Sequence, residues 1–243
     1  IVARLVAMEL SKRIGQTVIV DNKGGASGIL AAQHVARAKP DGYTLLVGGS
    51  GPMVFNRVTY KKLPYDPDKD LEAVTVVGSY PIVLLAGKDQ PFSTLPELIQ
   101  YAKKNPGKLN YGSAGASFQV PTEYFAAKAG IELVQVPYKG TSLAAQALMA
   151  GDIQLLSADI GPGAPLVASG HAKALAVASA HRNSILPQVP SFAESGIKGF
   201  GFSLDSAVAA PKGTSPEIVN YLQKELHAVL HSDNVKARLL AMG

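Results

Sequence analysis

The sequence of 243 residues contains no cysteine. This absence excludes disulfide bridges, thiolate catalysis and zinc sites with cysteine ligands. No apolar run reaches the roughly 18 residues that a membrane-spanning helix needs. Apolar residues make up 47% of the chain and charged residues only 17%, which is typical of a globular protein with a large buried core.

A concentrated basic surface is also missing, although the net charge is +5. The basic residues are scattered, and short clusters such as Lys61-Lys62 and Lys103-Lys104 carry no interleaved aromatic residues. Nucleic-acid binding needs a basic patch or stripe, so we expect no nucleic-acid partner. The mild positive charge favours encounter with anionic solutes instead.

Motifs of catalysis are absent as well. The sequence has no G-x-S-x-G elbow, and His34, His171 and His181 are isolated from any evident nucleophile. His227 and His231 have a spacing that can bind a metal, but the glutamate of the H-E-x-x-H motif and a third ligand are missing. A solvated helix face is the favoured interpretation of this pair, and we predict neither a metal nor a cofactor.

Helices and short β-branched strands alternate from the start of the chain. We predict a helix over 1–14, a strand over 17–20, a glycine-rich loop over 22–28 with a helix after it, and a strand over 43–47. This order is typical of a parallel sheet with crossover helices. The chain opens directly on the amphipathic pattern of a helix, and no signal peptide is visible. We therefore predict that the true N-terminus, with one strand, precedes Ile1.

The alternation restarts after Gly87, past two apolar strands predicted over 74–77 and 82–86. Two βα runs joined by apolar bridging segments predict two lobes with a double hinge and a cleft. Lobe I is expected to comprise 1–85 and 206–243, and lobe II 86–205. Further strands are predicted over 109–111, 133–136, 153–156, 174–177 and 206–209, and helices over 96–105, 121–129, 142–150, 165–169, 216–231 and 234–242.

Candidate binding residues stand at strand ends, where ligands gather in open parallel sheets. Ser113-Ala114-Gly115-Ala116-Ser117 follows a predicted strand, and the backbone N–H groups of the helix after it would suit a carboxylate. A plain βα turn is the alternative. Ser50 and Gly51 end another strand, where the glycines do not form a dinucleotide-binding motif.

Polar side chains also stand at three further ends of predicted strands. Tyr138 offers a hydroxyl and Lys139 a charge, although a solvated surface turn explains both equally well. Asp159 and Asp205 could accept hydrogen bonds from a ligand hydroxyl, an amine or water. The alternative for these aspartates is a turn-capping or exposed role.

Several stretches, taken in order along the chain, resemble the substrate-binding proteins of tripartite tricarboxylate transporters, the Bug (Bordetella uptake gene) family. They are Val18–Asn22 with its glycine-rich loop, Lys39–Leu46, Leu63–Pro67, Pro106–Gly115, Val136–Gly140, and Leu186–Pro190 with Glu194 and Gly196. The resemblance implies an α/β, type II periplasmic-binding-protein fold. It also implies a periplasmic monomer that delivers a small organic acid to the permease subunits of the transporter.

The family typically holds its carboxylate with backbone amides of two loops. The resemblance places one of them at Ser113-Ala114-Gly115 and the other before Ile1. After Gly115 the loop is shorter than the usual pattern and contains Phe118, and Asp205 stands where an aromatic residue is common. We therefore expect a ligand with an apolar or aromatic body, or one with a hydroxyl or amine facing Asp205.

Two other functions share such a cleft. A sensory module would present the closed form to a membrane kinase, and a two-lobe cleft enzyme would need a perturbed acid or base in the cleft. For the enzyme the sequence offers only Asp159, Asp205 and Lys139, with no recognisable pairing. We therefore predict a binding protein and no enzyme.

Overall fold

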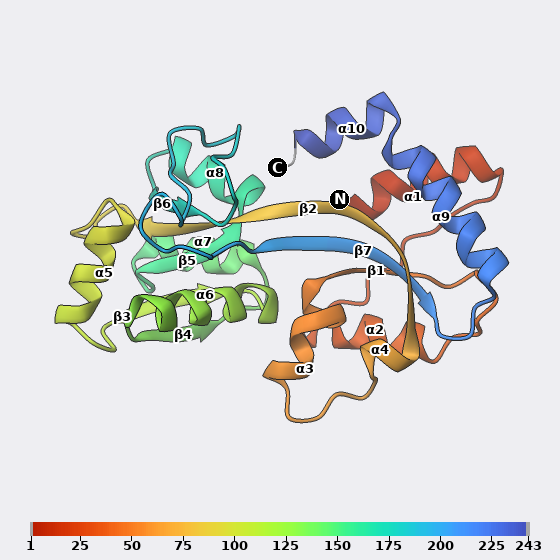
Figure 1. Ribbon diagram of the computed structural model, residues 1–243, viewed down its shortest axis with the longest axis horizontal. Coiled ribbons are helices and arrows are strands. Elements are labelled where there is room, and N and C mark those ends of the chain that lie inside the picture. Colours follow the sequence, from red (N-terminus) through yellow and green to blue (C-terminus); the bar gives the residue numbers. More distant parts are fainter. Residues whose placement is uncertain (1, 242–243) are drawn as a thin grey trace. The chain divides into compact units, whose positions relative to one another are not determined.

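The computed structural model describes residues 2–241 as two compact units (Figure 1). The first unit comprises the described residues up to Ser79 and from Asp205 onward, and the second is Tyr80–Leu204. The chain passes into the second unit within strand β2 (Leu71–Gly87) and returns within β7 (Ser203–Pro211). Among the helices of residues 2–241, none combines the length and the apolarity that crossing a membrane takes.

In the first unit, β7 lies between β1 (Leu46–Gly49), with which it pairs antiparallel, and β2. Successive side chains of a strand point to opposite faces. Val208 and Ala210 accordingly join one buried cluster and Ala209 the other. Both faces of the strands are therefore covered.

The helices of the first unit divide between these two faces. α1 (Val2–Ile14), α9 (Pro216–Leu230) and α10 (Asp233–Leu240) contribute to the cluster of Val208, and Figure 1 shows α1 beside α9. α2 (Ile29–Ala36) contributes to the cluster of Ala209. Shorter turns complete the unit: a 3₁₀ turn (Ala26–Gly28), a π-helical turn (Gly51–Phe55), α3 (Asn56–Thr59) and α4 (Pro67–Asp70).

Parallel strands form the centre of the second unit. β3 (Leu109–Ser113) lies between β4 (Leu133–Pro137) and β5 (Leu155–Asp159) and is parallel to both. β2 is antiparallel to β5 and to β6 (Ala172–Val177). The helices of this unit are α5 (Leu95–Lys104), α6 (Ala116–Ala129), α7 (Thr141–Ala150) and α8 (Ile160–Ala168).

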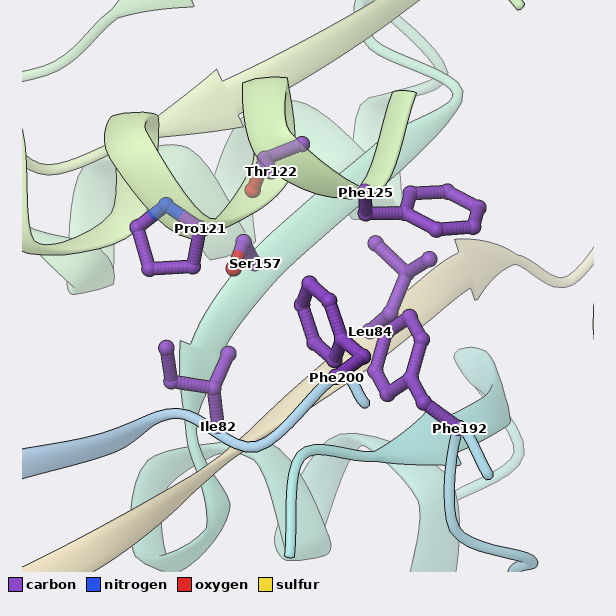
Figure 2. A pocket seen from close by; sticks show the side chains of 8 residues that line it. All are labelled: Ile82, Leu84, Pro121, Thr122, Phe125, Ser157, Phe192 and Phe200. Carbon is purple, nitrogen blue, oxygen red and sulfur yellow. The ribbon is translucent and has the colours of Figure 1, made fainter. Parts of the chain in front are cut away.

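The two faces of the second sheet have different partners. One face, with Val83 and Leu85 of β2 and Leu156 and Ala158 of β5, packs in a buried cluster with residues of α7 and α8. The alternate residues Ile82, Leu84 and Ser157 point to the other face, which α6 covers (Figure 2).

The strand predicted over 17–20 is wrong. These residues form no ladder within the described part of the chain, and the backbone N–H of Val18 donates instead to Ser11 Oγ at 2.9 Å. Ile19 is 83% exposed. A β-branched composition forms a strand only where a neighbouring strand supplies hydrogen bonds and packing.

Two boundaries also differ from prediction. The strands expected over 74–77 and 82–86 are one continuous strand, β2, because its successive parts pair with strands of both units. Helix α6 begins at Ala116 and contains Pro121, which was expected to open it. Pro121 is the sixth residue of α6, so the helix continues past it without the hydrogen bond that an N–H at this position would donate to the Ser117 carbonyl.

Candidate functional site

One edge of the second unit gathers most of the predicted binding residues. Because β3, β4 and β5 are parallel, their carboxyl ends at Ser113, Pro137 and Asp159 meet at this edge. β2 runs antiparallel to β5 and pairs Ile82 with Asp159, so Tyr80 lies at the same edge. The structure thus brings together Ser113–Ser117, Tyr138, Lys139 and Asp159, and adds Tyr80.

Ser113 holds the strand ends in place. Its side chain is fully buried, its hydroxyl oxygen accepts a hydrogen bond from Gln135 Nε2 at 2.8 Å, and its carbonyl accepts one from the Tyr138 N–H at 2.9 Å. The hydroxyl of Ser113 therefore positions the loop that leads into α6.

That backbone opens α6. Gly115 is its N-cap with φ 102° and ψ −178°, and no side chain caps the helix. The first N–H groups of a helix have no acceptor within the helix and carry a partial positive charge. Ala114, Ala116 and Ser117 have small side chains, so the backbone at this helix start can approach an anion closely.

Tyr138 and Lys139 follow β4 at the same edge. Tyr138 is half-buried and packs against the core of α7 and α8, whereas Lys139 is exposed. A Cβ added at Gly112 would lie 3.4 Å from Tyr138 Cε2 and 2.5 Å from Ile153 Cδ1, so β3 needs glycine there. Tyr138 thus serves packing, and the ammonium group of Lys139 contributes positive charge to the edge.

Asp159 ends β5 and stands at the N-cap of α8, but its side chain makes no capping hydrogen bond. Burial raises the pKa of its carboxyl group to about 6. A carboxylate that capped the helix would have a lowered pKa, because the N–H groups favour the charged form. The carboxyl group therefore does not cap the helix that it precedes.

Tyr80 is the residue that sequence reasoning missed. Its hydroxyl is buried and has no hydrogen-bond partner among the described residues. Burial first, and then the charge of Asp159, raise the pKa of the Tyr80 hydroxyl. In the sequence, Tyr80 is a single tyrosine beside Pro81 in a long apolar segment. Only the pairing of Ile82 with Asp159 shows that Tyr80 lies at the edge where the parallel strands end.

Ser50, Gly51 and Asp205 belong to the first unit. Ser50 is buried at the end of β1, and its hydroxyl oxygen accepts a hydrogen bond from the Asp205 N–H at 3.0 Å. Ser79, which was not predicted, donates its hydroxyl to Asp205 Oδ1 at 2.6 Å. Gly51 is buried at the start of the π-helical turn. The structure thus brings Ser50 and Asp205 together, and Ser79 orients the carboxylate.

An apolar pocket adjoins the edge of the second unit (Figure 2). Its eight lining residues are all buried, and the free space among them is narrow. Thr122 Oγ1 donates to the Phe118 carbonyl at 2.7 Å, which leaves the pocket little polar character. Its lining comprises Ile82 and Leu84 of β2, Ser157 of β5, Pro121, Thr122 and Phe125 of α6, and Phe192 and Phe200.

The side chains of His227 and His231 contact each other and the helix backbone. The two imidazole rings stack with centroids 3.8 Å apart, and His231 Nδ1 lies 2.8 Å from the His227 carbonyl oxygen. Over residues 2–241, no three His, Cys, Asp or Glu side chains are grouped so that they could hold a metal ion.

Comparison with known proteins identifies similar chains over this whole length. The sequence profile of the "Tripartite tricarboxylate transporter family receptor" matches residues 2–243. The protein BugT of Bordetella pertussis is 34% identical over 250 residues, which cover 100% of this chain and 76% of BugT.

Two solved structures are similar at the level of the fold. An R. palustris protein solved with adipate has 36% identity and a TM-score of 0.92, covering 100% of this chain and 82% of its own. MatC from Rhodopseudomonas palustris, solved with bound malate, has 34% identity and a TM-score of 0.91, covering 100% of this chain and 83% of its own.

Proposed function

Because the chain belongs to the tripartite tricarboxylate transporter receptor family, we propose that it is a solute-binding protein that captures a small organic carboxylate. Its α/β fold in two lobes is that of periplasmic binding proteins. The single observation that carries the proposal is the edge of the second unit. There the start of α6 and the exposed Lys139 offer N–H groups and positive charge to one anion.

Capture would proceed by closure of two lobes, 1–85 with 206–243 and 86–205. A ligand that contacts both lobes stabilises the closed state by its higher affinity for that state. Asp205, the last residue of the expected lobe II, lies in the first unit of the structure, where it would contact the ligand together with Ser50 and Gly51 of lobe I. The strand ends of β3, β4 and β5 would supply the contacts of lobe II. β2 and β7, which each run through both units, would carry the hinge.

The family supports a proposal for the location, the oligomeric state and the membrane partner of the protein. We propose a periplasmic location, a monomeric state, and delivery of the ligand to the membrane permease subunits of a tripartite tricarboxylate transporter. Binding without turnover is favoured over catalysis because the family is one of receptors. Turnover of a bound acid would reverse that preference, and a sensor kinase as the membrane partner would favour a signalling role.

The ligand proposed is a carboxylate with an apolar body. Similar proteins were solved with adipate and with malate, which supports an aliphatic acid. The pocket beside the edge supports an apolar body, because Ile82, Leu84 and Phe200 line it. Ser79 already binds one oxygen of Asp205, so a ligand hydroxyl or amine would share that carboxylate with it.

A melting-temperature screen tests the function directly. The panel comprises mono-, di- and tricarboxylates, including aromatic acids and acidic amino acids. A ligand at about 100 times its dissociation constant adds roughly 2.7 kcal/mol to the free energy of unfolding. For a chain of this size, the melting temperature should rise by about 5–10 °C. No rise with any acid of the panel would refute the proposed function.

Filling the pocket should change which acid binds. Ser157→Leu places an alkyl group in the space beside Ile82 and Leu84, so acids with an alkyl body should lose about tenfold in affinity. Malonate, whose body is too short to reach the pocket, should bind as before and serves as the internal control. Calorimetric titration of both acids measures the difference, and an equal loss for both would argue against the pocket as a ligand site.

A further inference from the structure

Two polar groups at the edge of the second unit lack a partner. The Tyr80 hydroxyl is buried without a hydrogen bond, and within residues 2–241 the Asp159 carboxyl group has neither a hydrogen bond nor an ion pair. Buried polar groups in native proteins are almost always hydrogen-bonded. The buried Tyr80 hydroxyl therefore points to a partner from outside the chain, and the Asp159 carboxyl group, whose side chain is only partly buried, is placed to bind the same partner.

Both groups lie on the face of the sheet that carries the pocket. Side chains two residues apart on a strand point to the same face. Tyr80 therefore shares the face of Ile82, and Asp159 shares that of Ser157. Because Ile82, which lines the pocket, pairs with Asp159, the two polar groups stand at the end of the pocket that is nearest to the edge.

No charged side chain compensates Asp159. Neither α8 nor the first two turns of α6, from Ala116 to Thr122, contain a titratable residue. Lys139 follows β4 and is exposed. The segment after β6 contributes the exposed His181, and Arg182, which pairs with Glu194 at 3.0 Å. Burial alone accounts for the raised pKa of Asp159.

The protonation state of Asp159 decides what it can bind. An ionised carboxylate at this position would repel a carboxylate ligand, because the two like charges would share a poorly solvated site. A protonated carboxyl group donates an O–H instead, and its hydrogen bond to a carboxylate is of the short, charge-assisted kind. A pKa of about 6 keeps the proton within reach of neutral pH.

We propose that Asp159 binds the carboxylate of the ligand through its own proton, with the Tyr80 hydroxyl as a second donor, so that capture of the anion takes up one proton from solvent. This inference rests on the proposed function and names a specificity-determining residue of the same site. It predicts a preference for carboxylates over amines at Asp159, and tighter binding in acidic surroundings.

The test is calorimetric titration of adipate and malate between about pH 6.5 and pH 8.5, where both acids are ionised. Affinity of the unmodified protein should fall up to about tenfold per pH unit, and buffers of different ionisation enthalpy should report uptake of about one proton. In Asp159→Asn the amide donates without a titrating proton, so affinity should be independent of pH. Tyr80→Phe should lose about fivefold at every pH with the slope unchanged.

Two matched variants separate Asp159 from its surroundings. Asp152→Asn removes an exposed carboxylate of the same unit, and His181→Gln removes an exposed imidazole from the segment after β6; both should keep the full pH slope. A flat profile in the unmodified protein, or an unchanged slope in Asp159→Asn, overturns the inference and leaves carboxylate capture standing. Affinity that rises with pH also overturns it, because Asp159 would then be an acceptor. Absence of binding at every pH overturns the proposed function together with the inference.

Discussion

Gly115→Ala is expected to lower carboxylate affinity about 100-fold, because charge-assisted hydrogen bonds are each worth roughly 1.5–3 kcal/mol. The backbone of Gly115, with φ 102° and ψ −178°, lies in a region that is essentially reserved for glycine. A Cβ there forces the start of α6 to shift, which moves the N–H groups of Ala116 and Ser117 away from the anion. Calorimetric titration with the acid that raises the melting temperature most would measure the loss.

The same helix supplies the control for this substitution. Gly130 caps the C-terminal end of α6 with φ 63°, and an added Cβ would meet no atom within 4 Å. Gly130→Ala should therefore lower stability through backbone strain alone and leave affinity unchanged. Equal affinity losses in the two variants would mean that α6 tolerates neither change and that its N–H groups do not hold the ligand.

Asp159→Asn is expected to stabilise the ligand-free protein at neutral and alkaline pH. The folded pKa of Asp159 is raised from 3.8 to about 6, so the native state binds the proton more tightly than the unfolded chain does. The stability that this proton contributes is complete below about pH 4 and is lost as the pH rises through about 6. Above that, the variant should gain about 2–3 kcal/mol, or roughly 5–10 °C in melting temperature.

Thermal melts of the two proteins at about pH 4 and about pH 8 check this expectation. The difference in melting temperature should be large at the higher pH and small at the lower one, where the folded protein keeps the proton and the unfolded chain, with a pKa of 3.8, is only partly ionised. Asp152→Asn, at an exposed carboxylate, should melt like the unmodified protein at either pH. If the melting temperature rose equally at both pH values, the amide would stabilise the protein by better packing, and the charge of Asp159 would not destabilise the folded state.

The strand ends of the second unit were predictable because they depend on local alternation. Parallel strands end at one edge, so Ser113, Tyr138 and Asp159 could be grouped before any coordinates were known. The same reasoning failed at Thr17–Val20, where composition favours a strand but no neighbour pairs with it. The composition of a segment permits a β-strand, but the strand forms only where a neighbouring strand pairs with it.

The missed residues depend on contacts between distant parts of the chain. Tyr80 reaches the edge through the pairing of Ile82 with Asp159, and Ser79 meets Asp205 across 126 positions of sequence. Phe192 and Phe200 line the pocket from irregular segments without periodicity. Neither the register of a strand nor the path of an irregular segment can be deduced from composition, so the sequence located the site only in part.

The long strand β2 has a consequence for how the molecule unfolds. Val74 and Val77 belong to the hydrophobic core of the first unit, whereas Val83 and Leu85 belong to that of the second. Losing β2 from either unit would expose apolar surface in both, so we expect the two units to unfold together. If the second unit were excised as an autonomous domain, the cut would pass through β2, which contributes buried residues to the cores of both units.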